Sequence, residues 1–575
     1  MIRLLKFLKP FAISIIAVFV LTFLQAISQL RLPQLMSSIV DVGIVKGDTP
    51  FILRTGLQML LVATLGSLCT VGTSYFSSTT SAGFGRLLRS KVFSRVESFA
   101  LNEFDRIGTS TLITRTTNDV THVQQAGIMI MRMMMRAPMM LIGGLVMAVS
   151  TDAKLSRILV FSMPLLFLAV YGIARQGYPL FRVIQQKLDR VNRVLREGLT
   201  GIRVIRAFNR TDYETRRFNE ANLDLTSTNV RVGRLMTLMD PAISLIFNFT
   251  TIAVVWLGSQ RVDLGEVQIG ALMAFVQYIG TILFALMQFS FLFMMLPRAA
   301  ASAERINEIL DTEPVINDPL VPTEPGNLRG HVEFRDVTFA YPGAETPAVQ
   351  NISFESRPGE LTAIIGGTGS GKSTLLNLIT RFYDVDHGQV LVDGVDVREM
   401  NQQELRQKIG LVPQASVLFT GSVAENIRYG KEDATDEEVQ HAAAVAQASE
   451  FISGMPGGFD AWITQGGTNL SGGQKQRMSI ARALVRRPEI YLFDDSFSAL
   501  DFKTDARLRA ALRNEMGNST VLIVAQRVST VMDADQIIVL DEGKIAGIGT
   551  HRDLLKSCQV YREIVASQLS EEELA

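Results

Sequence analysis

The residues whose chemistry is easiest to assign form one glycine-rich run in the C-terminal half. The run consists of Gly366, Gly367, Thr368, Gly369, Ser370, Gly371, Lys372, Ser373 and Thr374. It follows the apolar segment LTAIIG and precedes TLLNLITRF, which gives it the strand–loop–helix context of a P-loop. Glycines let backbone amides turn toward phosphates, Lys372 reaches the terminal phosphates and Ser373 can ligate magnesium. The run therefore predicts a site for ATP and Mg²⁺.

Further along the chain, an acidic residue and two short motifs extend this chemistry. The strand-like run Ile490–Phe493 ends in Asp494, the usual position of an acid that supports magnesium in P-loop ATPases. A solvated acidic turn is the alternative. It is disfavoured by the pentapeptide LSGGQ upstream, which contains Ser471, Gly472, Gly473 and Gln474, and by the run SALD, which ends in Asp501, downstream. The LSGGQ pentapeptide alone is weak evidence of function. The P-loop, LSGGQ, Asp494 and SALD in this order along the chain are a specific signal.

Composition bounds the setting in which these residues act. The chain has 575 residues, of which 47% are hydrophobic and only 19% charged, so it is oily for a soluble protein and long enough for several domains. Lys plus Arg equals Asp plus Glu at 56 each, which gives no case for nucleic acid as a partner. Cys69 and Cys558 are the only cysteines, so neither a disulfide framework nor a thiolate metal site can be built.

The excess of apolar residues lies in the first 300 positions, where six segments are long enough to cross a membrane. A spanning helix needs about 20 mostly apolar residues. The predicted spans cover approximately residues 10–32, 55–80, 126–150, 157–176, 240–260 and 267–297. Residues 1–9 resemble the basic start of a signal peptide, but the apolar run behind them is too long for one. We interpret them as an interfacial helix that leads into the first span.

The third span raises a separate question because it begins near Val123 and carries Arg132 and Arg136 into or near the membrane. Intramembrane arginines are costly and suggest a functional site by default. The alternative, which we weight more heavily, is that they snorkel or pair with a carboxylate near the membrane edge. Seven methionines share this region and could form an adaptable ligand surface or ordinary packing: Met129, Met131, Met133, Met134, Met135, Met139 and Met140.

Charge in the loops predicts the orientation. The segments 86–122 and 175–234 are long, polar and rich in arginine, whereas the other loops are short and charge-balanced. By the positive-inside rule the long loops are cytoplasmic. Each exceeds an ordinary helix connection, so the spans are expected to continue well beyond the membrane. The sequence thus predicts a multi-pass cell-membrane protein whose N-terminus and C-terminal domain are cytoplasmic.

A change in composition marks the boundary between the two halves. Residues 311–330 contain four prolines with acidic and turn-forming residues, as expected of a linker. After it, short β-rich runs alternate with helical stretches, which indicates an α/β domain with a mainly parallel sheet. The predicted fold class is an all-α six-helix transmembrane domain at 1–310, followed by an α/β P-loop domain at 331–575.

The ordered motifs resemble those of the ATP-binding cassette (ABC) family, and the six-span half resembles exporter half-transporters over nearly the whole chain. The resemblance implies that Tyr341 stacks on adenine and that Gln414 links magnesium to the membrane half. It also places Asp501 in a loop that faces a second cassette, and Ser373, Gln414 and Asp494 at the metal. The loop tips at 105–115 and 209–217 are expected to dock on the nucleotide domains as coupling helices.

Two positions depart from the family pattern. Asp495 stands where the family normally has a glutamate that polarises the attacking water, and its side chain is one methylene shorter. Positioning of a general base is worth about 10² to 10⁴ in rate. Gln526 stands where the switch histidine would contact the γ-phosphate, and glutamine cannot become cationic. Both changes affect one ATP site whose phosphate-binding loop is intact, so we expect binding with poor hydrolysis.

The departures lead to a hypothesis about a partner. In this family each ATP site joins the P-loop of one cassette to the LSGGQ of another, and this LSGGQ is intact. We expect a heterodimer in which Ser471 and Gly473 complete a competent site on a second half-transporter. That partner would carry the catalytic glutamate and the histidine. Such asymmetry resembles the heterodimeric bacterial multidrug exporters.

The function expected from the resemblance is ATP-driven export of small hydrophobic or amphipathic molecules across the lipid bilayer. A lipid flippase would differ only in cargo. An ATP-gated channel or a regulatory subunit is an alternative from another class, because a degenerate site permits it. The sequence does not identify the substrate.

Overall fold

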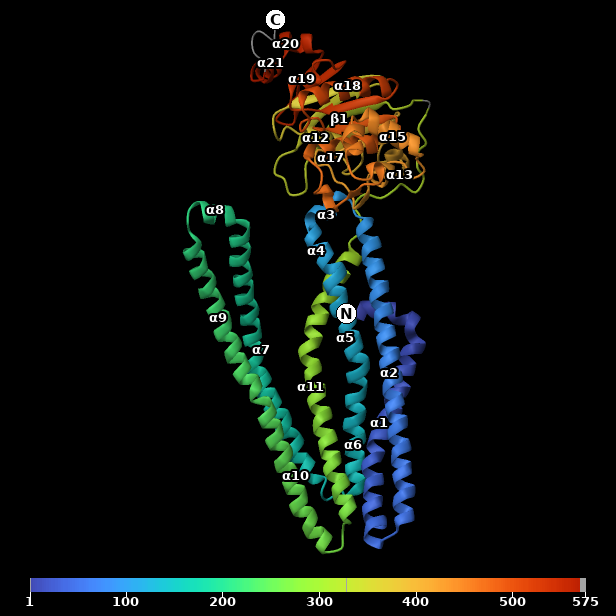
Figure 1. Ribbon diagram of the computed structural model, residues 1–575, viewed down its shortest axis with the longest axis vertical. Coiled ribbons are helices and arrows are strands. Elements are labelled where there is room, and N and C mark those ends of the chain that lie inside the picture. The colour runs from blue at the N-terminus through green and yellow to red at the C-terminus, as the bar shows by residue number, and fades with distance from the viewer. Residues whose placement is uncertain (1, 327, 569–575) are drawn as a thin grey trace. The chain divides into compact units, whose positions relative to one another are not determined.

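The computed structural model describes residues 2–326 and 328–568, and contacts divide the chain into two compact units. Unit 1 holds the chain up to Glu97 together with Thr109–Thr312. Unit 2 holds Ser98–Gly108 together with the chain from Glu313 onward. Unit 1 is built of long helices, and all the strands of the described residues belong to unit 2 (Figure 1). Six membrane-length helices followed by an α/β domain confirm the predicted fold class.

The helical segments of unit 1 follow one another with short connections. In chain order they are η1 (Ile2–Phe11), α1 (Ala12–Ser38), η2 (Ile39–Ile44), α2 (Thr49–Glu97), α4 (Thr109–Thr114), η3 (Arg115–Asp119), α5 (Val120–Met129), η4 (Ile130–Met134), α6 (Met135–Thr151), α7 (Arg157–Thr200), α8 (Ile202–Ala207), α9 (Thr211–Thr237), α10 (Met239–Asp263) and α11 (Ile269–Asp311). The segments η2, η3 and η4 are π-helical turns that join the α-helices on either side of them. Such wide turns inside helices are frequent at functional sites.

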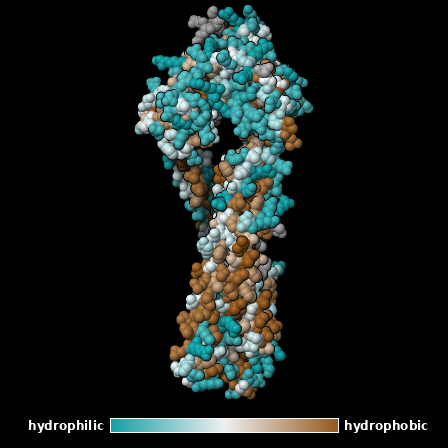
Figure 2. Space-filling view, turned by 90° about the vertical axis from the view of Figure 1, so that its right-hand side faces the viewer, coloured by the Kyte–Doolittle hydropathy of each residue, from teal (hydrophilic) through white to brown (hydrophobic). Residues whose placement is uncertain are grey.

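Within the described residues, six helical stretches are long and apolar enough to cross a membrane: Arg3–Ile44, Thr49–Glu97, Thr109–Thr151, Arg157–Thr200, Thr211–Asp263 and Ile269–Gln288. A helix of 49 residues such as α2 extends about 74 Å, while the hydrocarbon layer is about 30 Å thick. The helices therefore continue well past the membrane. Figure 2 shows the corresponding band of hydrophobic side chains over these helices, with hydrophilic side chains at their short-loop ends.

Polar contacts fix the short turns between the helices. Arg261 at the end of α10 pairs with Asp152 and lies 2.9 Å from Glu266, which also pairs with Lys154. Across another turn, Asp41 accepts a hydrogen bond of 2.6 Å from the backbone amide of Gly270. These pairs tie together turns that are distant in sequence, and so they set which helices are neighbours.

At the other end of unit 1, the buried carboxylate of Asp119 is held by a single guanidinium. Arg305 on α11 donates from Nε at 2.8 Å and from Nη2 at 2.5 Å. The side chain of Asp119 is 3% exposed, whereas that of Arg305 is 46% exposed. Bidentate pairs of this type are stronger than neutral hydrogen bonds, so this pair joins the η3 turn to α11.

Unit 2 contains three sheets. The six-stranded sheet has the order β12-β11-β3-β10-β9-β6, with β12 antiparallel and the other strands parallel. The four-stranded antiparallel sheet has the order β2-β1-β4-β5, and β7 pairs with β8. The strands are β1 (Val332–Phe339), β2 (Val349–Ser356), β3 (Leu361–Gly366), β4 (His387–Val392), β5 (Val395–Asp396), β6 (Ile409–Val412), β7 (Gly421–Ser422), β8 (Trp462–Ile463), β9 (Ile490–Asp494), β10 (Thr520–Val524), β11 (Gln536–Asp541) and β12 (Lys544–Gly549).

The helices of unit 2 cover these sheets. They are α3 (Leu101–Ile107), α12 (Lys372–Ile379), α13 (Gln402–Gln407), α14 (Val423–Arg428), α15 (Asp436–Val445), α16 (Ser449–Ser453), η5 (Gly458–Asp460), η6 (Gln465–Gly467), α17 (Gly472–Leu484), α18 (Phe502–Glu515), α19 (Val528–Val531), α20 (His551–Ser557) and α21 (Gln559–Ala566). The two faces of β3 enter different cores, because strand residues alternate between faces. Ile364 packs with α12 and the four-stranded sheet, while Ala363 and Ile365 pack with the helices opposite.

The short helix α3 belongs to unit 2 although it lies between two helices of unit 1 in the sequence. The carboxylate of Asp105 on α3 accepts a 2.9 Å hydrogen bond from the hydroxyl of Tyr383. Glu103 accepts a 3.3 Å bond from the backbone amide of Val315. Burial and the neighbouring Asp105 charge raise the pKa of Tyr383, so this phenol stays protonated and donates.

Loss of the Arg305 guanidinium would leave the buried carboxylate of Asp119 without its partner. We expect Arg305→Ala to lower the free energy of unfolding by about 2–4 kcal/mol and Arg305→Lys by less, since lysine keeps the charge but not the fork. Arg3→Ala is the matched control, because its pair with Asp311 is 75% and 57% exposed and should matter by under about 1 kcal/mol. Thermal unfolding in detergent measures the three variants, and equal losses for Arg3→Ala and Arg305→Ala would contradict the assignment.

Candidate ATP-binding site

The glycine-rich run forms the loop between β3 and the N-terminus of α12. Gly371 has a φ of 92°, and a Cβ built there would lie 2.5 Å from the carbonyl oxygen of Ala348. At Gly366 a Cβ would lie 2.2 Å from the carbonyl oxygen of Leu540. Only glycine fits either position, because side chains are excluded by backbone atoms that cannot move aside. The loop therefore keeps its amides close to any phosphate that binds at α12.

Lys372 is held inside this loop. Its ammonium donates to the carbonyl oxygens of Gly366 at 2.9 Å and Gly367 at 2.6 Å. Burial lowers the pKa of Lys372, while the charges of Asp495 and Asp494 oppose that shift. The two carboxylates and the loop carbonyls thus keep a buried cation in place where terminal phosphates would meet it.

Ser373 and Asp494 meet across the sheet edge. The hydroxyl of Ser373 donates to Oδ1 of Asp494 at 2.9 Å. Burial raises the pKa of Asp494, and the nearby charge of Asp495 adds to the shift, while Ser373 and Lys372 lower it. Mg²⁺ prefers oxygen ligands and uses one or two carboxylates together with substrate phosphates. The Ser373 hydroxyl and the Asp494 carboxylate are oxygen donors of this kind, so the pair fits a magnesium ion bound together with nucleotide phosphates.

Asp495 follows β9 in the left-handed backbone region, with a φ of 46°. Its amide donates to the carbonyl of Val524 at 2.9 Å, and its carbonyl accepts from the hydroxyl of Ser498 at 2.9 Å. Burial raises the pKa of the carboxyl, against the effects of Ser498, Arg527, Lys372 and a hydrogen bond from Gln414. The structure therefore brings Asp495, Gln414, Lys372 and Asp494 together, as the sequence predicts.

Gln526 is exposed, and within the described chain its side chain makes no hydrogen bond to the carboxylates. Its backbone carbonyl accepts a 2.8 Å bond from the amide of Gln568, whose side-chain oxygen also accepts from the amide of Val528. Arg527 donates to the carbonyl of Ser498 at 3.0 Å. Gln568 and Arg527 position this loop, and sequence reasoning missed both because neither lies in a recognisable motif.

Tyr341 lies just beyond β1 and above the P-loop helix. Its hydroxyl lies 3.1 Å from that of Thr374. Its ring meets Phe339 and Tyr383 edge-on, with centroid distances of 5.1 and 5.3 Å. An aromatic ring fixed in this way beside the phosphate-binding loop can stack on a base.

The LSGGQ segment starts α17 and lies apart from these groups. Ser471 caps the helix by accepting from the amide of Gln474 at 3.3 Å, and its own amide donates to the Gln474 side chain at 2.9 Å. Gly473 lies against Ala499, where a Cβ would come 3.0 Å from the carbonyl oxygen. Asp501 caps α18 through the amide of Thr504 at 2.9 Å, and this bond lowers the pKa of Asp501. Ser471 and Asp501 bond only to nearby residues of the described chain.

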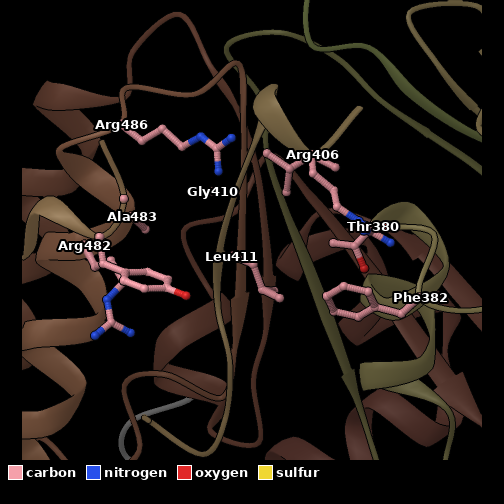
Figure 3. Close-up of a pocket in the computed structure, with 11 residues that line it drawn as sticks. Thr380, Phe382, Arg406, Gly410, Leu411, Arg482, Ala483 and Arg486 are labelled. Carbon is pink, nitrogen blue, oxygen red and sulfur yellow. Dashed lines mark hydrogen bonds between the residues drawn. The ribbon is translucent and has the colours of Figure 1, made fainter. Parts of the chain in front are cut away.

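A separate hollow on unit 2, of about 230 Å³, is lined by arginines and aromatic rings (Figure 3). Arg406 donates to the carbonyls of Thr380 and Arg381 and lies over the Phe382 ring. Arg482 donates to the carbonyls of Asn426 and Val417, and burial lowers its pKa. Backbone carbonyls occupy these two guanidiniums, and Arg486 is the third arginine that lines the hollow.

Comparison with known proteins identifies the class. Residues 15–287 match the family described as ABC transporter transmembrane region, and residues 349–498 match the family ABC transporter. The chain belongs to the ABC transporters and has the fold of an exporter half-transporter. It aligns over 97% of its length with a bacterial Atm1-family ABC exporter solved with ATP bound, covering 98% of that chain with a TM-score of 0.81 and 26% identity.

Three curated relatives place the chain within that family. It is 44% identical to an uncharacterized ABC transporter ATP-binding protein of Mycobacterium tuberculosis, over 98% of this chain and 97% of the relative. It is 35% identical to the fatty acid ABC transporter ATP-binding/permease protein of the same species, over 83% of this chain and 75% of the relative. It is 32% identical to the ATP-dependent lipid A-core flippase of Thiobacillus denitrificans, over 99% and 98%. The chain is therefore a multi-pass membrane protein with a transport ATPase domain.

The raised pKa of Asp494 predicts a pH-dependent affinity for magnesium. A protonated carboxyl cannot ligate a cation, so the Mg²⁺-dependent gain in ATP affinity should fall as the pH is lowered toward the pKa of Asp494. The fall should begin at a higher pH than for an ordinary aspartate of pKa 3.8. Fluorescent-nucleotide titration with and without Mg²⁺ measures this gain.

Two variants control this measurement. Asp494→Asn should lose the magnesium gain at every pH. Asp495→Asn removes a neighbouring negative charge and should shift the fall to lower pH. If the gain in Asp494→Asn keeps the wild-type pH dependence, another group holds the metal.

Proposed function

We propose that this chain is one subunit of a heterodimeric ABC exporter whose own ATP site binds nucleotide but hydrolyses it slowly. Bound Mg²⁺ would neutralise charge on the β- and γ-phosphates. Tyr341 stacks on the adenine, the P-loop amides and Lys372 hold the phosphates, and Ser373, Gln414 and Asp494 hold the metal. The observation that carries the proposal is the complete set of binding residues around a shortened carboxylate, Asp495.

The shape of the site supports slow hydrolysis. Asp495 is half-buried beside Gln414, Lys372 and Ser498, where its raised pKa favours a neutral carboxyl more than in water. Its side chain is one methylene shorter than glutamate, and an attacking water at the glutamate position would be out of reach by over an ångström. A displacement of about 1 Å can cost about 10²-fold in rate. Gln526 lies exposed beside this site and adds no positive charge to the γ-phosphate.

The signature segment supports a second, competent site. Ser471 and Gln474 form a reciprocal capping box at the N-terminus of α17. The N-terminus of this helix of 13 residues carries positive potential that favours a phosphate. In this family LSGGQ faces the P-loop of a second cassette, so we infer that the phosphate near Ser471 belongs to another chain. That partner would carry the catalytic glutamate and the switch histidine.

The loop tips fit a role in coupling. Helix α3 in the first tip belongs to unit 2, through Asp105 and Tyr383. The second tip, residues 209–217, clusters with unit 1 alone, so we propose that it docks on the partner cassette. In this arrangement ATP closes the cassettes, the tips move the helices, and hydrolysis at the partner site resets them. The arginine-rich long loops support a cytoplasmic location for the tips, the N-terminus and unit 2.

The names of two relatives favour amphipathic cargo. One relative is named for fatty acid and another for lipid A-core, so a lipid flippase is the second candidate. Export of hydrophobic drugs stays within the same mechanism. A channel gated by ATP is a further alternative, and ATP-dependent accumulation of an amphipathic dye against its gradient in vesicles would exclude it.

Restoring the family residues should restore hydrolysis at this site. With the partner glutamate inactivated, we expect Asp495→Glu combined with Gln526→His to raise ATPase activity by about 10²-fold or more, since a positioned base contributes about 10² to 10⁴. Asp541→Glu is the matched control, because it adds the same methylene at an exposed strand end outside the site. A coupled ATPase assay on the co-purified pair makes the comparison.

Two results would contradict the heterodimer proposal. One is brisk ATPase activity by this chain purified alone as a homodimer. The other is complete loss of turnover in the pair carrying Asp495→Asn, equal to the loss caused by removing the partner glutamate. Co-purification from the native membrane identifies the second chain directly.

A further inference from the structure

Among the described residues, the third membrane-length stretch of unit 1 carries two guanidiniums without a carboxylate partner. Arg132 lies in the π-helical turn η4, and Arg136 lies one turn later in α6. An α-helical rise puts Arg136 about 24 Å and Arg132 about 30 Å from Asp152 at the end of α6. Asp152 and Arg261 mark the polar turn at one membrane face, and the hydrocarbon layer is about 30 Å thick. Both arginines therefore lie in the half of the membrane opposite that turn.

Hydroxyls solvate Arg132 but do not neutralise it. Its Nε donates to the hydroxyl of Ser77 at 2.7 Å, and its Nη2 donates to the hydroxyl of Ser78 at 2.7 Å and to the carbonyl of Ser74 at 3.0 Å. Arg136 donates from Nη2 to the side-chain oxygen of Gln29 at 3.0 Å. The serines lie in the stretch Thr55–Gly85, which contains no acidic residue. In the described chain neither guanidinium has a carboxylate partner.

Both Arg132 and Arg136 keep N–H groups that donate no hydrogen bond among the described residues. Nη1 of Arg132, and both Nε and Nη1 of Arg136, meet no acceptor in the described part of the chain. Two buried hydroxyls on α2, one turn to either side of Ser77, also lack a partner among the described residues. These belong to Thr73, 5% exposed, and Thr80, 1% exposed. A buried polar group without a partner is unusual in a folded protein, so this region has unused hydrogen-bonding groups as well as unneutralised charge.

Elsewhere in the same unit, the fold pairs arginines with carboxylates. Arg261 pairs with Asp152 and Arg305 with Asp119. A charge within the hydrocarbon is costly and is compensated by a partner, by water or by a ligand. Flexible methionines adjoin the two arginines, and such side chains adapt to apolar chains of differing shape. Positive charge and adaptable apolar surface together fit a molecule with an acidic head and a hydrocarbon tail.

We propose that Arg132 and Arg136 form a binding site for the acidic headgroup of an anionic amphiphile, a carboxylate or a phosphate. The site rests on the proposed transport function for its purpose, and it makes the substrate class anionic rather than merely hydrophobic. The long loops put the two arginines in the cytoplasmic half of the membrane, so the amphiphile would enter from that leaflet. A fatty acid and an acidic phospholipid share the required chemistry.

Binding without ATP tests the site independently of turnover. The full-length chain, with any partner that co-purifies, is placed in phosphatidylcholine nanodiscs and titrated with oleate and with oleoyl lysophosphatidic acid. We expect at least one of these anions to bind and the same-chain methyl oleate and oleylamine to bind about tenfold or more weakly, as loss of a charge-assisted contact implies. Which anion binds distinguishes the two sources of headgroup.

Variants assign the binding to these residues. Arg132→Gln with Arg136→Gln should abolish the preference for anions, and Arg157→Gln, which removes an exposed arginine at the start of α7, should leave it unchanged. Ser77→Ala separates binding from folding, because it loses a structural bond but keeps the guanidinium, and the anion preference should persist. Equal binding of oleate and methyl oleate, or a preference that survives the double variant, would overturn the proposal.

The outcome is separable from that of the transport proposal. Anion binding that depends on the two arginines would stand even if vesicles showed no ATP-driven accumulation. Accumulation of neutral dyes with no anion preference would support export and overturn this site.

Discussion

The parallel register of β3, β10 and β9 is the constraint on which the chemistry of unit 2 depends. Val524 pairs with Ile364 on one side and with Asp494 on the other, so the three strands end at one edge of the sheet. The P-loop leaves β3 there, the two aspartates leave β9, and the segment carrying Gln526 leaves β10. A one-residue slip in a strand reverses which face each side chain occupies. Such a slip would remove Asp494 from Ser373 and would also exchange the two cores that enclose the sheet.

Much of this architecture follows from the sequence because its causes are local. Runs without charge predict membrane helices, since a backbone in hydrocarbon must satisfy its own hydrogen bonds. The spacing of glycines around Lys372 predicts the loop, because each glycine answers a backbone requirement. The sequence predicts that Ser373 and Asp494 lie at one site, and the structure joins them by a hydrogen bond. Their roles toward nucleotide are proposals.

Other features depend on which distant segments meet, and no local pattern encodes that. The pairing of Asp119 with Arg305 and the bond from Tyr383 to Asp105 join residues that are far apart in sequence. Gln568 reaches back to Gln526 from the turn after α21, so composition there gives no sign of a role. For the arginines of the third span, the sequence interpretation favoured snorkelling or a carboxylate partner. Among the described residues the structure gives them hydroxyl and amide partners and no carboxylate, because α1 and α2 offer no acid near them, and snorkelling stays a prediction.

Those partners decide what the arginines can do. A carboxylate beside Arg132 would cancel its charge, and an incoming acid would then have to displace a strong ion pair before it could bind. Serine hydroxyls and a glutamine amide reduce the cost of burying a guanidinium through hydrogen bonds, yet they leave its net charge intact. The π-helical turn at η4 adds room in the helix at the same point. The arrangement keeps both arginines charged and available to an anion, which distinguishes them from Arg261 on α10 and Arg305 on α11, whose charges are neutralised by carboxylates.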